Sequence, residues 1–223
     1  MTNNASTERT PIRALIYDCD GTLVDSELLN AQGVAHMFQT EHGVELDPVA
    51  IEAEFRGGRF ATMIDTLAAR HGVTVASNFT DRYRRHTIDL FERALKPMPG
   101  VREAIEALDL PRCVASSSPE EKLAVALKTT DLARYFGDFV FSAYSIGAWK
   151  PEPDLFLTAA AALGAAPGDC AVIEDSNAGV EAARRAGVRV FGYDPNGAIG
   201  DHPQAQLTRF TDFAELPGLI ARG

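Results

Sequence analysis

The sequence has few cysteines, no long apolar run and no excess of basic residues. Its three cysteines, Cys19, Cys113 and Cys170, are an odd number, and each lies in or beside a stretch that we expect to be a buried strand. We therefore expect reduced structural thiols rather than a disulfide framework. No histidine lies near Cys19 in the sequence to activate it as a nucleophile.

No stretch approaches the ~18 apolar residues that a membrane span needs, and the polar N-terminus lacks the apolar core of a secretory signal. We expect a cytoplasmic protein that spans no membrane. The formal net charge of −10 argues against nucleic acid or an anionic membrane as a partner, because either would favour a basic face. A small anionic metabolite is not excluded, since a few arginines and lysines can bind phosphate inside an acidic protein.

Apolar stretches of strand length alternate with helical patterns through most of the chain. Each stretch is followed by a turn or a helix start, which is typical of an α/β fold with a doubly wound parallel sheet. The expected strands cover residues 12–17, 112–115, 139–142, 170–173 and 188–192. We expect the fifth strand to complete the sheet, and a short helix near 211–221 to end the chain.

One block interrupts this alternation. It contains a helix that ends near His42 and further helical patterns at about 48–55, 60–71 and 78–95, with no convincing strand between them. Prolines at 97 and 99 then punctuate the chain. We therefore expect two domains, which are an inserted helical domain at residues 24–95 and an α/β core formed by residues 1–23 and 96–223.

The motif Asp18-Cys19-Asp20-Gly21-Thr22 directly follows the first expected strand. It places two carboxylates in one loop, which is costly unless a cation or a shared proton compensates. Gly21 lets the backbone turn tightly, and Thr22 supplies a hydroxyl that can hold the loop or a bound oxyanion. The motif indicates metal binding or divided acid and nucleophile roles, with an ordinary acidic turn as the alternative.

Three further polar groups follow later strands. Ser116 follows the second expected strand, Lys150 lies a few residues after the third, and Glu174 and Asp175 end the fourth. In an open parallel sheet the carboxyl ends of the strands lie along one edge, where ligands bind at the topological switch point. We therefore expect all of these side chains to meet the first motif at that edge.

The serine run 116–118 precedes a helix. We expect Ser118 to cap that helix, with Pro119 at its first position and Glu121 completing a capping box. This leaves Ser116 beside the backbone N–H groups of a helix start, an arrangement that binds anions. Ser117 is a further candidate for substrate binding.

These residue types can support phosphoryl transfer. Asp18 is the natural nucleophile, and Asp20 could protonate the leaving oxygen and later activate water. Lys150 and Ser116 would neutralise and hydrogen-bond the transferring phosphoryl oxygens. Mg²⁺ prefers oxygen ligands and relieves the repulsion between the anions. The candidate metal ligands are Asp18, Asp20, Glu174 and Asp175.

Each group on its own also has an ordinary structural interpretation. Lys150 is then a solvated loop lysine, and Ser116 is a loop or cap residue. Glu174 and Asp175 are then an acidic pair at a helix N-terminus, where the macrodipole favours them. Their joint occurrence in this order favours one shared site.

The four motifs resemble, in sequence and order, those of the haloacid dehalogenase superfamily. They are D-x-D-G-T, a serine after a hydrophobic strand, a lysine before proline, and E-D-S-x-x-G. The resemblance covers residues 12–220 and implies that the helical insert is that superfamily's cap. Within the superfamily the chain is most similar to sugar-phosphate phosphatases related to β-phosphoglucomutase, in particular the 6-phosphogluconate phosphatase type. The segments that carry this closer similarity are 55–59, 71–74, 141–144 and 149–151.

The resemblance implies a Mg²⁺-dependent phosphoric monoester hydrolase that forms an aspartyl phosphate and acts on a small phosphorylated sugar or sugar acid, such as 6-phosphogluconate. The run Ser116-Ser117-Ser118 departs from the Ser-Asn-Gly of the most similar phosphatases, which leaves the substrate open. A phosphosugar mutase that returns the phosphoryl group to sugar is one alternative. A non-catalytic binding protein is another, although the catalytic motifs are intact. We expect a monomer, with a dimer as the alternative.

Selection of the substrate is expected from the helical insert. Arg56 and Arg59 flank Gly57 and Gly58 at a turn between two helices. Glycine flexibility could let both guanidinium groups point at a carboxylate or hydroxyls of the metabolite. We expect this role of Arg59 first and of Arg56 second, with a solvated surface pair as the alternative.

Overall fold

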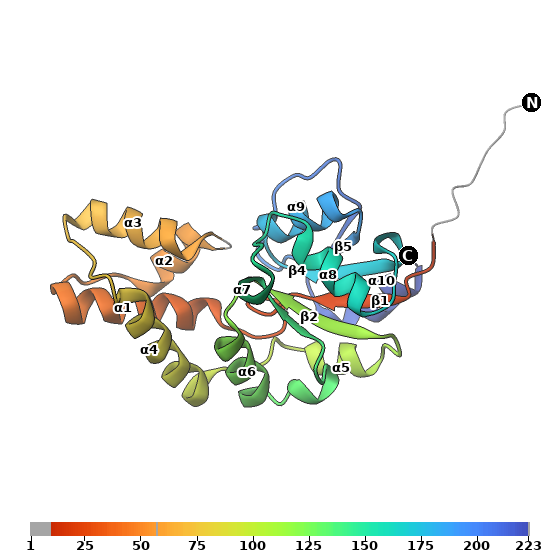
Figure 1. Ribbon diagram of the computed structural model, residues 1–223, viewed down its shortest axis with the longest axis horizontal. Coiled ribbons are helices and arrows are strands. Elements are labelled where there is room, and N and C mark those ends of the chain that lie inside the picture. Colours follow the sequence, from red (N-terminus) through yellow and green to blue (C-terminus); the bar gives the residue numbers. More distant parts are fainter. Residues whose placement is uncertain (1–9, 57, 223) are drawn as a thin grey trace, which may run out of the picture.

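The structure is a computed structural model that describes residues 10–56 and 58–222, arranged as a helical lobe and an α/β lobe (Figure 1). The strands are β1 (Ala14–Tyr17), β2 (Arg112–Ser116), β3 (Val140–Ser142), β4 (Cys170–Glu174), β5 (Arg189–Tyr193) and β6 (Leu207–Phe210). They form one parallel sheet of order β3-β2-β1-β4-β5-β6. The direction of winding reverses between β1 and β4, as in a doubly wound fold. The predicted fold class is confirmed.

Helices cover both faces of the sheet. On one face lie α5 (Val101–Glu106), α6 (Glu120–Thr129) and α10 (Leu216–Arg222), and on the other α8 (Asp154–Ala162) and α9 (Asn177–Ala186). Leu15 and Tyr17 of β1 join the apolar cluster of the first face, and Ala14 and Ile16 join that of the second. Successive side chains of a strand point to opposite faces, so a strand between two helix layers is apolar at every position.

The register of the central strands brings their carboxyl ends level. Tyr17 at the end of β1 lies opposite Val114 of β2 and Ile173 of β4. The next backbone N–H, of Asp18, donates to the carbonyl of Ile173 at 2.9 Å. The residues that directly follow β1 and β4 are therefore neighbours, although more than 150 residues separate them in the chain.

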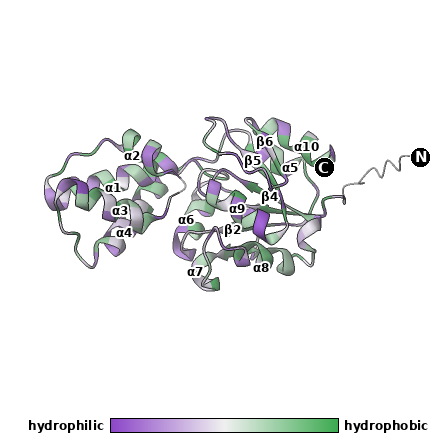
Figure 2. Ribbon diagram, turned by 90° about the horizontal axis from the view of Figure 1, so that it is seen from above, coloured by the Kyte–Doolittle hydropathy of each residue, from purple (hydrophilic) through white to green (hydrophobic). Residues whose placement is uncertain are grey.

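The helical lobe has an apolar core of its own. Its helices are α1 (Glu27–His42), α2 (Pro48–Phe55), α3 (Phe60–His71) and α4 (Phe79–Ala94). They enclose a cluster that includes Phe38, Leu67 and Phe79 and is separate from the two clusters of the sheet. Figure 2 shows this lobe standing apart from the α/β lobe. The domain boundaries at residues 24 and 95 stay a prediction, which this separate core supports.

A sixth strand corrects one expectation from the sequence. The fifth strand does not complete the sheet, because β6 pairs with β5 from Val190–Leu207 to Tyr193–Phe210. Only Phe210 of this edge strand is buried, so its sequence lacks the apolar run that marks the other strands. The remaining elements are α7 (Ala143–Ile146) and the 3₁₀ helices η1 (Ala133–Tyr135), η2 (Pro167–Asp169) and η3 (Phe213–Glu215).

Two other expectations concern the state of the cysteines and the absence of a membrane span. Cys19, Cys113 and Cys170 are free and buried, which fits structural thiols. Burial raises the pKa of the Cys19 thiol, so the reactive thiolate is disfavoured. Among the described residues, no helix has the length and apolar character to cross a membrane.

Candidate active site

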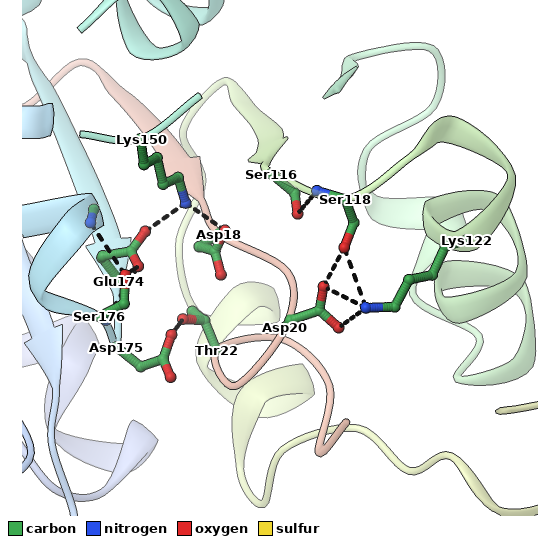
Figure 3. A network of polar contacts seen from close by, with 11 residues as sticks. Asp18, Asp20, Thr22, Ser116, Ser118, Lys122, Lys150, Glu174, Asp175 and Ser176 are labelled. Atoms are coloured by element: carbon green, nitrogen blue, oxygen red, sulfur yellow. Dashed lines mark hydrogen bonds and ion pairs between the residues drawn. The ribbon is translucent and has the colours of Figure 1, made fainter. Parts of the chain in front are cut away.

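The carboxyl edge of β1, β2 and β4 gathers the polar side chains that the sequence singled out in the core (Figure 3). Asp18 and Asp20 lie in the loop after β1, Ser116 ends β2, and Glu174 and Asp175 close β4. Lys150 reaches the same edge from the segment between α7 and α8. The structure therefore brings together residues from four separate stretches of the chain.

Lys150 joins the first and last of these motifs. Its Nζ donates to Asp18 and, at 2.6 Å, to Glu174 Oε2, and all three residues are buried. Its Nζ also lies 5.1 Å from the centroid of the Phe156 ring on α8. Burial alone would lower the pKa of Lys150, but the two carboxylates outweigh burial and raise it. The lysine therefore remains protonated and compensates part of the negative charge.

Glu174 is fixed by the start of α9. Its Oε1 accepts hydrogen bonds from the backbone N–H and the hydroxyl of Ser176, at 3.1 and 2.6 Å. The same hydroxyl accepts from the backbone N–H of Gly179 at 3.1 Å and so caps the helix. A Cβ on Gly179 would lie 2.0 Å from Glu174 Cδ. The motif E-D-S-x-x-G thus describes one packed unit of carboxylate, cap and helix.

Three carboxylates form a group that could hold a metal ion. Asp18, Glu174 and Asp175 each offer one oxygen, and these oxygens lie within 4.8 Å of one another. An all-oxygen, anionic donor set suits a hard cation such as Mg²⁺. Burial, with Glu174 as the next cause, raises the pKa of both Asp18 and Asp175, which is the expected result of confining like charges. The residues present therefore fit the predicted magnesium ion.

Asp175 is held by the loop of the first motif. Thr22 donates its hydroxyl to Asp175 Oδ1 at 3.2 Å. Gly21 has φ of +76°, and a Cβ there would lie 2.2 Å from Asp175 Oδ2. Thr22 therefore helps to hold the neighbouring loop, and its binding of a phosphate oxygen stays a prediction. Gly21 is required both for its backbone conformation and for the close approach of the Asp175 carboxylate.

The Asp20 carboxylate points away from the three other carboxylates (Figure 3). Ser26 donates to its Oδ1 at 2.5 Å and Ser118 to its Oδ2 at 2.5 Å. Lys122 donates to the same two oxygens at 2.9 and 3.0 Å. Of the four predicted ligands, Asp20 is thus the one whose side chain lies outside the metal-type group found among the described residues.

The role expected of Ser118 was wrong, and Lys122 was missed. The helix α6 begins at Glu120 with Pro119 at the N-cap position and no side-chain cap, because the Ser118 hydroxyl bonds Asp20 instead. A carboxylate acceptor makes the stronger hydrogen bond of the two. The signal that could have identified Lys122 is its position in the first turn of the helix that follows the serine run.

The remaining serines lie beside this network. Ser116 is buried, and its Oγ accepts from the backbone N–H of Ser118 at 3.2 Å. Ser117 is exposed. The anion-binding roles predicted for both residues stay predictions.

The pKa of Asp20 shifts in the opposite direction from those of Asp18 and Asp175. Burial raises the pKa of Asp20, but Lys122 and the serine hydroxyls outweigh burial, and the net result is a lowered pKa. Burial lowers the pKa of Lys122, but the charge of Asp20 outweighs burial, and the pKa of Lys122 is raised. In the resting site Lys122 therefore favours the ionised form of Asp20.

A cleft of about 230 Å³ links this edge to the helical lobe. It is lined by Asp175, Gly21 and the loop after β5 on the core side, and by the start of α1 and one face of α2 on the side of the helical lobe. Arg56 lines the cleft and bonds Glu52, one turn back on α2. Arg59 is exposed at the start of α3 and is not part of the lining. Gly57, between them, lies outside the described residues.

The contact between Gly179 and Glu174 generates a prediction. Gly179→Ala should lower phosphatase turnover by about tenfold or more, because the new methyl group must displace Glu174 and with it Lys150. Thermal unfolding should show a loss of roughly 1–3 kcal/mol. The matched control is Gly168→Ala, where a Cβ meets no atom within 4 Å. Equal turnover in the two variants would show that the position of Glu174 is not critical.

The chain matches known proteins over most of its length. The family model of haloacid dehalogenase-like hydrolases matches residues 12–187. The chain is 37% identical over 216 residues to a 6-phosphogluconate phosphatase of Escherichia coli (strain K12), covering 95% of this chain and 96% of the relative. It is 31% identical to a phosphorylated carbohydrates phosphatase of Thermotoga maritima, covering 81% and 85%.

A solved structure agrees with these relatives. A hydrolase of the same family from Deinococcus radiodurans R1, solved with bound phosphate and sodium, is 29% identical and superposes with a TM-score of 0.76. The match covers 96% of each chain. The resemblance inferred from the motifs is thereby confirmed. The chain belongs to the haloacid dehalogenase-like hydrolases and is an enzyme of their phosphatase branch.

Proposed function

We propose that the protein hydrolyses a small phosphorylated sugar or sugar acid through an aspartyl phosphate on Asp18, with Mg²⁺ as its cofactor. The observation that carries this proposal is the contact of the buried Asp18 carboxylate with Lys150, inside a group of three carboxylates suited to a cation. A carboxylate so placed is held in one orientation and is ready for attack on phosphorus.

The side chains divide the reaction between them. Asp18 attacks phosphorus through one oxygen while the bond from phosphorus to the sugar oxygen breaks, and Asp20, in its protonated form, gives its proton to that oxygen. In the second half, water attacks the phosphoryl group, Asp20 takes the water's proton, and the bond to Asp18 breaks. Lys150 and the hydroxyl of Ser116 neutralise and orient the phosphoryl oxygens. Glu174 keeps Lys150 in place.

The cofactor would be held by Asp18 and Asp175, with Glu174 beside them. When bound, Mg²⁺ offsets the negative charge that the phosphoryl group and the carboxylates bring together. Both oxygens of Glu174 already accept hydrogen bonds, from Ser176 and Lys150. Asp175 accepts one from Thr22 within the described part of the chain, so we take Asp175 as the principal ligand of the pair.

Replacement of the nucleophile tests the mechanism. Asp18→Asn should reduce phosphate release from phosphorylated sugars and from p-nitrophenyl phosphate to background, because an amide cannot form the acyl phosphate. The near-isosteric change should leave the circular dichroism spectrum intact. Purified enzyme with Mg²⁺ is compared across a panel of phosphorylated metabolites. Activity of the variant within about tenfold of the native enzyme would rule out the aspartyl phosphate.

The metal assignment has its own test. Asp175→Ala should raise the Mg²⁺ concentration for half-maximal activity by about tenfold or more, and it should weaken Mg²⁺ binding measured by calorimetry. Glu174→Ala should lower turnover with a smaller change in Mg²⁺ affinity, because it releases Lys150. The reverse order of affinities would show that Glu174 is the principal ligand. Full activity in excess chelator would remove Mg²⁺ from the mechanism.

The substrate class is supported by the relatives and by the cleft. Two relatives act, by their names, on 6-phosphogluconate and on phosphorylated carbohydrates. In this chain the cleft that opens at Asp175 is lined by carboxylates and by Arg56, groups that hydrogen-bond sugar hydroxyls or pair with a carboxylate. We propose that Arg56 contacts the part of the substrate away from the phosphate. For Arg59 the same role remains a prediction, with less support from its exposed position.

Substitution of Arg56 separates recognition of the sugar from chemistry on the phosphate. Arg56→Ala should raise KM for 6-phosphogluconate about tenfold, which is about 1.4 kcal/mol of binding, and should hardly change hydrolysis of p-nitrophenyl phosphate. The control is Arg70→Ala, since Arg70 pairs with Glu54 in the same lobe but is more exposed, at 47% against 27% for Arg56.

Comparison of 6-phosphogluconate with p-nitrophenyl phosphate also distinguishes the other roles that Arg56 could have. Equal losses on both would mean that it supports closure of the lobe or phosphate binding in general. No change on either substrate would mean that Arg56 is an ordinary surface residue. Arg59→Ala measured beside it tests the expectation for that residue.

A phosphosugar mutase would use the same aspartyl phosphate. The same panel distinguishes the two enzymes, since a mutase yields an isomeric sugar phosphate and little free phosphate. A cytoplasmic location and a monomeric state stay predictions.

A further inference from the structure

Lys122 is a partly buried charge at the site, and the mechanism above gives it no role. Its Nζ donates to both oxygens of Asp20 and, at 3.2 Å, to the hydroxyl of Ser118. The side chains of Lys122 and Asp20 are each 18% exposed. A pair so far withdrawn from water is screened much less than a surface pair and holds a defined geometry.

A second contact fixes the lysine from the other side. The ring centroid of Phe91, near the end of α4, lies 5.3 Å from Lys122 Nζ, close enough for a cation–π interaction. Phe91 itself is fully buried in a cluster with Leu123 of α6. Lys122 is therefore held between the Asp20 carboxylate and an aromatic ring, at the place where α4 of the helical lobe packs on α6 of the core.

We propose that Lys122 is a positioning residue that holds the Asp20 carboxylate on the leaving-group side of the site. This inference rests on the proposed function, in which Asp20 exchanges a proton with the leaving oxygen and with water. In an in-line displacement both of these oxygens lie opposite the nucleophile across phosphorus. The acid–base group must therefore stay apart from Asp18, and the carboxylate of Asp20 does point away from it (Figure 3).

The distribution of charge supports the same role. Lys150 bonds Asp18, and Lys122 bonds Asp20, so each aspartate of the loop has a lysine of its own on a different side. Without Lys122, Asp20 would keep two serine donors but no ion-pair partner among residues 10–56 and 58–222. It would then be free to rotate among other hydrogen bonds and would lose the fixed position that proton transfer needs.

The test is a double-mutant cycle of Lys122→Met and Asp20→Asn, followed by kcat and KM, with Mg²⁺, for the sugar phosphate that the native enzyme hydrolyses fastest. A sugar oxygen needs a proton to leave, whereas p-nitrophenolate does not. Lys122→Met should lower kcat about tenfold or more and change KM by less than about threefold. In the Asp20→Asn background it should change kcat by less than about threefold, because a residue that acts through Asp20 has nothing left to position. Lys122→Arg keeps the charge and should recover most of the lost kcat.

Controls keep the outcome decisive. Lys128→Met, an exposed lysine on the same helix, should behave as the native enzyme. If Lys122→Met does not fold, kcat is compared between Lys122→Arg, which keeps the charge, and Lys122→Gln, which removes it. An equal loss of kcat with and without Asp20 would overturn the proposal, and so would a tenfold rise in KM at unchanged kcat, which marks direct phosphate binding. Native turnover in Asp20→Asn alone would instead overturn the acid–base role of Asp20 in the proposed function.

Discussion

Four carboxylates share one edge of a parallel sheet, and their mutual repulsion is the constraint around which the site is built. Within the described residues, two lysines compensate part of this charge from opposite sides, Lys150 for the group around Asp18 and Lys122 for Asp20. Buried charges are tolerated only when they are paired and hydrogen-bonded. A phosphate ester adds further negative charge, which the proposed cation in the carboxylate group would offset.

The same constraint explains residues that carry no charge. Gly179 leaves room for Glu174 against the first turn of α9, and Gly21 leaves room for Asp175. The hydroxyls of Ser26 and Ser118 both bond Asp20, although each lies at or next to a helix N-terminus where a capping role is common. At this edge, satisfying a carboxylate takes precedence over local helix capping.

Much of the fold and of the site follows from strand periodicity and from the rule that parallel strands end at one edge. Asp18, Lys150 and Glu174 could be assigned to one place because each follows an apolar strand. The direction of a side chain could not be assigned in this way. Asp20 turns away from Asp18 because its partners, such as Lys122, lie on a different element. The spacing of the two aspartates in the loop does not reveal this direction. Similarly, β6 was missed because its sequence, Leu-Thr-Arg-Phe, has only one buried residue and lacks the apolar run that marked the other strands.

Chemistry and specificity are separate in the proposed mechanism, because the sheet edge would contact the phosphate while the cleft beside it is shared with the helical lobe. The motifs at the edge therefore indicate a reaction shared by the whole family, and the walls of the cleft must select the rest of the substrate. In the proposed mechanism, whether the phosphoryl group passes to water or to a sugar hydroxyl depends on which oxygen reaches Asp20. Since Lys122 and Phe91 tie that carboxylate to the junction of α6 with α4, the helical lobe can govern both the choice of substrate and the fate of the phosphoryl group.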